Sequence, residues 1–125
     1  MIKVTQAEAM GAFTALMEMR GRKMGFQTAL SIVKLHKALE TNARFQIEEE
    51  EKIFREFGKE KGPDGGVDFG EDKEARTKCL EKLQELAKME VEIEAKPINL
   101  QAEENNPDFK ISPEELAALE KFIQA

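Results

Sequence analysis

Only two side chains in these 125 residues are of the kind that commonly act as a base or a nucleophile near neutral pH. His36 is the single histidine and Cys79 is the single cysteine. A cysteine nucleophile needs a base such as histidine within hydrogen-bond reach, but the helical hairpin derived below places Cys79 close to Glu51, far along the helix from His36. We therefore expect no catalytic residue, no cofactor and no enzymatic activity. His36 is expected on a surface or in a helix seam, and Cys79 is expected to pack as a small apolar residue.

Four acidic side chains near the middle of the chain are close enough in sequence to suggest a cation site: Asp64, Asp68, Glu71 and Asp72. Carboxylate oxygens suit calcium, but this spacing fits no EF-hand loop. The same stretch is rich in glycine, yet it lacks the Gly-Lys-Ser/Thr ending of a phosphate-binding loop, and its aspartates would repel phosphate. We predict a turn without a metal, and metal binding is the alternative.

A basic cluster is the first candidate for binding rather than catalysis. Arg20, Arg22 and Lys23 lie together at the expected end of the first helix, and Lys34 and Lys37 follow in the next helix. Such a cluster could bind an anion or an acidic partner. The alternative is an ordinary solvated turn rich in basic residues.

Apolar residues near the same turn are the second candidate. Their number exceeds what the predicted neighbouring helices can cover, and the expected interface residues are Met17, Met24, Leu30 and Val33. Methionine side chains adapt to partner surfaces, although filling an irregular core is their more common use. These residues predict a protein partner, and a second copy of the chain is the preferred one.

Composition limits the class of protein. The hydrophobic set makes up 41% of the chain and charged residues 35%, a balance typical of a folded, well-solvated helical protein. The length predicts a single helical domain over residues 1–125. A net charge of −6 gives no general attraction to phosphate backbones, so no nucleic-acid partner is expected.

Cysteine content and apolar runs indicate where the protein is found. A single cysteine suits a reducing compartment. The first ten residues lack the apolar core of a signal peptide, and no stretch of 18 consecutive apolar residues occurs. We expect a cytoplasmic protein with no membrane partner.

The strongest structural signal is a run of 32 residues, Phe26 to Phe57, that contains no glycine or proline. As a helix it would be about 48 Å long, which exceeds the diameter of a compact body built by so short a chain. Its first half carries apolar residues on more than one face and is the predicted core. Its second half has a narrower stripe typical of a two-helix seam, formed by Leu39, Ala43, Ile47, Phe54 and Phe57.

The partner in that seam is a predicted helix over residues 72–89. A turn at residues 62–66 would bring it back along the long helix as an antiparallel hairpin resembling a coiled coil. Leu80, Leu83 and Leu86 would then face the long helix. The Glu48 to Glu51 run would lie opposite Lys78 and Lys82, with complementary charges.

Capping residues predict the two remaining helices. Thr5 and Glu8 form a capping box that begins a helix over residues 6–20. Ser112, Pro113 and Glu115 begin a helix over 113–124 in the same way. Between the third and the last helix, apolar residues alternate with charged ones and predict a short extended segment near residues 90–100. The expected fold class is therefore mainly α.

The last third of the chain also resembles a known group of proteins. The motifs are Met89-Glu90-Val91-Glu92-Ile93, Pro97-Ile98 and Ile111-Ser112-Pro113-Glu114-Glu115-Leu116-Ala117-Ala118-Leu119-Glu120-Lys121-Phe122-Ile123. Together with the preceding long helix and turn, they resemble a family of small uncharacterised proteins of tailed bacteriophages and prophages. The resemblance implies origin and fold, and it assigns no functional residue.

Two functions fit these expectations. The first is a phage or prophage protein that acts without catalysis, as a homo-oligomeric assembly or accessory component in the bacterial cytoplasm or in the virion. The second is a small inhibitor that sequesters a host factor.

Overall fold

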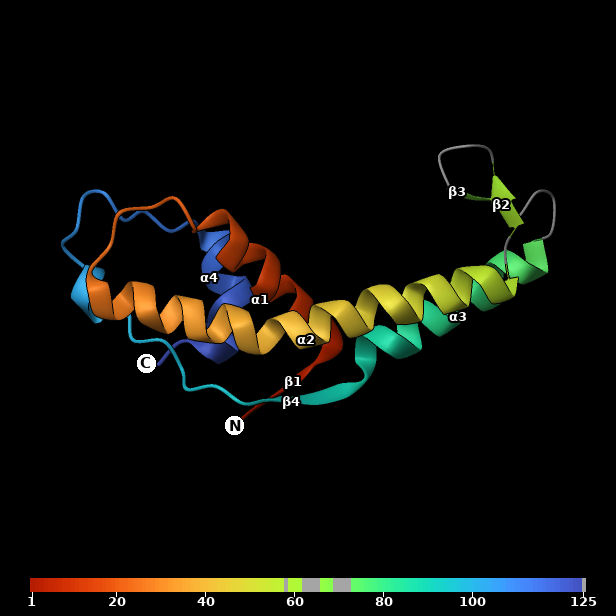
Figure 1. Cartoon of the computed structure of the whole chain (residues 1–125), viewed down its shortest axis with the longest axis horizontal. Coiled ribbons are helices and arrows are strands. Elements are labelled where there is room, and N and C mark those ends of the chain that lie inside the picture. Colours follow the sequence, from red (N-terminus) through yellow and green to blue (C-terminus); the bar gives the residue numbers. More distant parts are fainter. Residues whose placement is uncertain (58, 62–65, 69–72, 125) are drawn as a thin grey trace.

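The computed structural model of the chain describes residues 1–57, 59–61, 66–68 and 73–124 and is mainly helical (Figure 1). The elements, in order, are β1 (Ile2–Thr5), α1 (Gln6–Glu18), α2 (Phe26–Phe57), β2 (Lys59–Lys61), β3 (Gly66–Asp68), α3 (Lys73–Lys88), β4 (Glu90–Ile93), the 3-10 helix η1 (Gln101–Glu103), α4 (Pro113–Leu119) and the 3-10 helix η2 (Glu120–Phe122). Helix α3 runs antiparallel beside the distal half of α2, whereas α1 and α4 lie at the base of α2. The predicted class, a mainly α fold built on a long helical hairpin, is confirmed.

Helix α1 begins where its capping residues place it. The Thr5 hydroxyl accepts from the Glu8 backbone N–H at 3.1 Å, and the Thr5 backbone N–H donates to the Glu8 carboxylate at 2.9 Å. The helix ends at Glu18, with Met19 as its C-cap, rather than at Arg20 as expected. Met19, the residue directly after the helix, is fully buried in the core, and the backbone departs from helical geometry after it.

Strand β1 is an element that the sequence analysis missed. It pairs antiparallel with β4, with Ile2 opposite Ile93 and Val4 opposite Val91. The extended segment expected near residues 90–100 is therefore present as β4, followed by irregular chain. The alternation of Ile2 and Val4 is too short a signal by itself, since a four-residue strand is formed by its long-range partner.

The last helix is shorter than predicted. Regular α-helix ends at Leu119 and η2 follows, instead of one helix over 113–124. The backbone then turns extended, because Ile98 donates to the carbonyl of Phe122 at 2.7 Å and Gln124 donates to the carbonyl of Ile98 at 2.8 Å. Backbone hydrogen bonds to Ile98, which is distant in sequence, thus take the place of the last helical turn.

The core lies between the base half of α2, helix α1, the β1–β4 pair and the C-terminal elements. Its largest fully buried apolar side chains are Leu16, Met19, Leu35, Leu39, Ile93, Ile98, Leu119 and Phe122. On α2, Ile32 and Leu35 are buried, but Leu30 and Val33 remain exposed. The base half of α2 thus contributes to the core as predicted, but on one side only, and Leu30 and Val33, two of the predicted interface residues, lie outside that core.

The hairpin seam contains only some of the predicted residues. Leu39, Cys79 and Leu86 are buried as expected, whereas Ile47 and Leu80 are both more than half exposed. Each residue advances a helix by 100°, so the step of four residues from Leu39 to Ala43 and again to Ile47 rotates the side chain out of the seam. The half-buried positions on α2 follow spacings of three and four instead and include Gln46 and Glu50.

The predicted cross-helix charge pairs were also wrong. Lys78 pairs with Glu74 and Lys82 pairs with Glu85, both within α3. On α2, Glu49 pairs with Lys52, and Glu50 accepts from the Gln46 amide at 2.7 Å. Side chains three and four positions apart on one helix are already neighbours, which makes these pairs easier to form.

Several expectations fall outside the described residues: residues 62–65 of the turn predicted at 62–66, the possible cation ligands Asp64, Glu71 and Asp72, and the side chains of Phe57 and Asp68. In the part that is described, no helix is long and apolar enough to cross a bilayer.

We predict that Leu39→Ala lowers the free energy of unfolding by about 2–5 kcal/mol, because it leaves a cavity beside α1 in a fully buried position. Leu80→Ala removes the same atoms from an exposed position on α3 and should change stability by less than about 0.5 kcal/mol. Urea unfolding followed by circular dichroism compares the two variants. Equal losses would contradict the assignment of the core to the base of α2.

Candidate interaction surface at the base of the hairpin

A hollow of about 410 Å³ lies where the end of α1, the following link and the start of α2 meet. Its lining residues are Met19, Arg20, Arg22, Lys23, Met24, Ala29, Ile32 and Val33. The buried side chains of Met19 and Ile32 form an apolar floor. The structure therefore brings the predicted basic cluster together with Met24 and Val33, two of the four predicted interface residues.

Exposed apolar side chains continue from this hollow along α2. The exposed fractions are 75% for Phe26, 37% for Leu30, 48% for Val33 and 46% for Met17 on α1. Helices α1 and α2 run antiparallel, since Gln6 on α1 contacts Asn42 on α2 and, further along α1, Phe13 stacks on His36. Continuing this register to the end of α1 places Met17 at about the same height along α2 as Val33. We call Met17, Met24, Phe26, Leu30 and Val33 the base face.

Phe26 is the residue of the base face that the sequence analysis did not select. It is the first residue of α2, and we expected it only to begin the helix. Its spacing of four and seven residues from Leu30 and Val33 places all three on one side of the helix. That spacing was the available signal.

Unpaired cations surround the base face. Within the described residues, no ion pair includes Arg20, Lys23, Lys34 or Lys37. Residues 1–39 contain six basic and two acidic side chains, whereas residues 40–125 contain thirteen basic and twenty-three acidic ones. Basic side chains are thus concentrated in the first 39 residues, whereas the C-terminal elements that pack at the base (residues 90–124) contain nine acidic and three basic side chains.

Arg22 differs from the other cations because it is bound within the protein. Its guanidinium donates to one Glu115 carboxylate oxygen at 2.9 Å and to the carbonyl of Lys110 at 2.6 Å, and it lies 2.8 Å from the second Glu115 oxygen as an ion pair. Glu115 also accepts from the Ser112 backbone N–H at 3.0 Å, as part of the capping box of α4. Arg22 therefore ties the link before α2 to the start of α4, and the predicted anion or partner patch has Arg20 and Lys23 as its unpaired members.

The protonation of Glu115 is shifted by this contact. The hydrogen bond from Arg22 lowers the pKa of the Glu115 carboxyl, partly offset by burial and reinforced by the Ser112 backbone N–H. The ionised form is therefore the one that the folded protein stabilises.

A second buried carboxylate holds the other end of the link. Glu103 accepts from the Gly25 backbone N–H at 2.7 Å and from the Asn106 side chain at 2.7 Å, and the hydrogen bond from Asn106 is the main cause of the lowered Glu103 pKa. The carboxylate lies against the N-terminus of α2, where negative charge is favourable. A side chain on Gly25 would approach it to 3.0 Å, so glycine suits this position.

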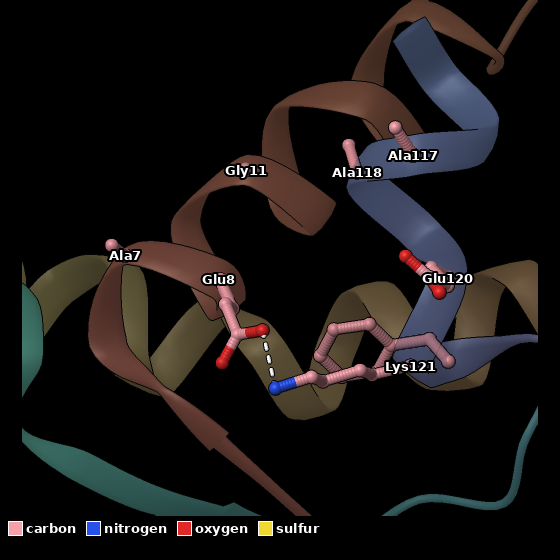
Figure 2. A pocket seen from close by; sticks show the side chains of 8 residues that line it. Ala7, Glu8, Gly11, Ala117, Ala118, Glu120 and Lys121 are labelled. Carbon is pink, nitrogen blue, oxygen red and sulfur yellow. Dashed lines mark ion pairs between the residues drawn. The ribbon is translucent and has the colours of Figure 1, made fainter. Parts of the chain in front are cut away.

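A smaller hollow, of about 290 Å³, lies between α1 and the C-terminal elements (Figure 2). Small side chains line its walls, among them Ala7, Ala117 and Ala118. Lys121 donates to the Glu8 carboxylate at 2.6 Å and thereby lowers the Glu8 pKa. Two of the three charged groups at this hollow, Glu8 and Lys121, are thus paired with each other across α1 and η2, and Glu120 is the third.

The two residues first considered for catalysis have packing contacts. The His36 ring stacks on Phe13, with centroids 4.6 Å apart. Cys79 is buried in α3, and burial raises the pKa of its thiol, which disfavours the nucleophilic thiolate. Over the described part of the chain, no three His, Cys, Asp or Glu side chains are grouped as metal ligands.

Comparison with known proteins adds no assignment, since no protein-family model, no curated protein and no solved structure matches the chain. The resemblance to phage and prophage proteins therefore stays a prediction.

We predict that acid destabilises the fold, because the pKa values of Glu8, Glu103 and Glu115 are all lowered from 4.5. A carboxyl with a lowered folded-state pKa stabilises the protein fully above its unfolded pKa, and this stability is lost as the pH falls through the folded value. Glu115→Gln should cost about 1–3 kcal/mol at pH 7, and its difference from the wild type should shrink between pH 5 and pH 3.

The control is Glu114→Gln, since Glu114 is the exposed neighbour in the same first turn of α4 and should change stability little at either pH. Urea unfolding at several pH values measures both variants. A loss that stays constant from pH 7 to pH 3 would contradict the role given to the Arg22–Glu115 ion pair.

Proposed function

We propose that this protein is a non-enzymatic component that acts by binding protein through its base face, and that the bound protein is a second copy of the chain. The observation that carries the proposal is the exposed apolar surface of Met17, Phe26, Leu30 and Val33 beside a hollow with an apolar floor. Contiguous apolar patches on soluble proteins are small and often mark interaction sites. Covering these side chains would supply the main favourable free energy of association.

The non-enzymatic part of the proposal rests on the use of the reactive side chains. His36 and Cys79 both serve in packing, and the carboxylates with lowered pKa values are held in caps and ion pairs. Each lowered pKa favours the ionised form, whereas a carboxyl that donates a proton near neutral pH needs a raised pKa.

The proposed biological setting follows from the resemblance of the C-terminal third to phage and prophage proteins. In that setting the protein would be an assembly or accessory component. Mass spectrometry of purified virions would test it, with the phage-infected cytoplasm as the comparison sample. Absence of the protein from both would contradict the setting without affecting self-association.

Self-association can be tested directly by measuring mass in solution. We expect analytical ultracentrifugation to show a mass that rises with concentration above 14.1 kDa. The double variant Leu30→Gln with Val33→Gln should stay monomeric at the same concentrations, because polar side chains gain little from being covered. Both positions are exposed, so the fold should be retained.

The matched control is Leu80→Gln, which alters an even more exposed leucine on α3 and should leave the association unchanged. A wild-type protein that remains monomeric at every concentration would contradict self-association. In that case the base face would bind a different protein, which is what the hypothesis of an inhibitor directed at a host factor requires.

A further inference from the structure

The hollow between the end of α1 and the start of α2, which we call the base hollow, has a lining that favours an anion. Among the described residues that line it, three are basic and none is acidic. Acidic side chains line two other hollows: Glu8 and Glu120 line the one in Figure 2, and Glu92 and Glu94 line one of about 430 Å³ beside the middle of α2. Clefts lined by one sign of charge concentrate ligands of the opposite sign. Of these three hollows, the base hollow is therefore the one suited to an anionic ligand.

Two cations of the base hollow are available to such a ligand. Arg20 and Lys23 are exposed, and no ion pair within the described residues includes either of them. Arg22 is bound by Glu115, so that carboxylate already has a cationic partner. The other carboxylate beside the link, Glu103, is buried and accepts hydrogen bonds from the backbone at the start of α2 and from a side chain of its own loop. Both carboxylates are thus engaged away from Arg20 and Lys23.

The floor and walls of the base hollow are apolar. Met19 and Ile32 are buried at the floor, Met24 and Ala29 are half-buried, and Val33 completes the lining. Methionine side chains are flexible and adapt to the shape of what they contact. An apolar chain that lies on this floor is removed from water, which is the main source of favourable free energy for apolar contacts.

The link that forms one wall of the base hollow is held in place by the C-terminal part of the chain. The Asn106 side chain donates to the carbonyl of Lys23 at 3.2 Å. Glu103 accepts from the Gly25 backbone N–H, and the guanidinium of Arg22 is bound at the start of α4. A wall that is already ordered loses little conformational entropy when a ligand binds, so the shape of the hollow is formed in advance.

We propose that the base hollow binds a medium-chain fatty acid, with the carboxylate paired with Arg20 and Lys23 and the chain on the apolar floor. At about 30 Å³ per non-hydrogen atom, the volume of about 410 Å³ holds a ligand of about a dozen such atoms. Octanoate and decanoate, with about ten and about twelve non-hydrogen atoms, meet this limit. The carboxylate takes up little of the volume and leaves the rest to the chain. The site lies beside the base face, and its occupation does not depend on self-association.

Titration with octanoate tests the proposal, with 1-octanol and acetate as controls. Octanol has the same apolar chain without the charge, and acetate has the charge without the chain. A ligand of this size in a preformed hollow should give a dissociation constant of about 0.1–1 mM for octanoate. The value for octanol should be about three- to tenfold higher, because each exposed ion pair contributes up to a few-fold in affinity. Acetate should show no measurable binding in this range.

NMR spectra of the methionine methyl groups locate the ligand. Met19 and Met24 line the base hollow, whereas Met89 lies between α3 and β4 and does not. The methyl signals of Met19 and Met24 should shift as octanoate is added, and that of Met89 should stay in place. A shift of Met89 without shifts of the other two would overturn the assignment of the site.

Removing the cations separates the charge from the apolar contact. Arg20→Gln with Lys23→Gln should weaken octanoate binding about three- to tenfold and leave octanol binding unchanged, so that the two ligands become equivalent. The matched control is Lys34→Gln with Lys37→Gln, which removes two exposed cations of α2 that do not line the hollow. This control should retain the preference for octanoate.

Filling the hollow tests the apolar part of the site. Ala29 is half-buried in its wall, and Ala29→Leu takes up volume that the ligand needs. This variant should weaken octanoate and octanol to the same extent, by at least about tenfold. Circular dichroism checks that its helices remain.

The outcomes separate this inference from the proposed function. Equal affinity for octanoate and octanol in the wild type, or binding of octyl phosphate without binding of octanoate, would overturn the fatty-acid site. Leu30→Gln alters the base face but not the lining of the hollow, so it should weaken self-association and still bind octanoate. A wild type that binds octanoate yet stays monomeric would contradict the proposed function alone. A wild type that self-associates without binding octanoate would contradict this inference alone.

Discussion

The structure depends on one constraint: a helix about 48 Å long can be covered on only one side by the elements that pack against it. Helices α1 and α4 contact one another at the base, and α3 follows the distal half (Figure 1). All of the buried apolar residues of α2 face these elements. The opposite side keeps Phe26, Leu30, Val33 and Ile47 in solvent, and this imbalance is the physical source of the proposed interaction.

Polar contacts, rather than apolar packing alone, fix the base against α2. Glu103 caps the start of the long helix through Gly25, and Arg22 joins the preceding link to Glu115 in α4. Gln6 is fully buried and donates to the carbonyl of Asn42 at 2.9 Å. A buried polar group without a partner costs about as much as a lost hydrogen bond or more, so these contacts select one arrangement of the short elements on the helix.

Local sequence patterns predicted which helices form more accurately than they predicted which residues of those helices are buried. The 32-residue run without glycine or proline, the capping box at Thr5 and Glu8, and the capping box at Ser112 and Glu115 all mark elements that are present. Strand β1 and the end of α4 were missed or misplaced because each is formed by a backbone partner that is distant in sequence. For the candidate site, the basic cluster and four of the five base-face residues, all except Phe26, were identified in advance, whereas Phe26 and the internal ion pair of Arg22 were not.

The sequence by itself determined where helices begin and how long the central one is, because capping and the absence of helix breakers act over a few residues. Only the tertiary structure decided which faces are buried: Ile47 and Leu80 lie outside the seam, and Lys78 and Lys82 pair within their own helix. Each residue turns a helix by 100°, so an apolar stripe specifies a face only once its neighbours are in place. The same holds for Arg22, since its partner lies 93 residues away and no local pattern records that distance.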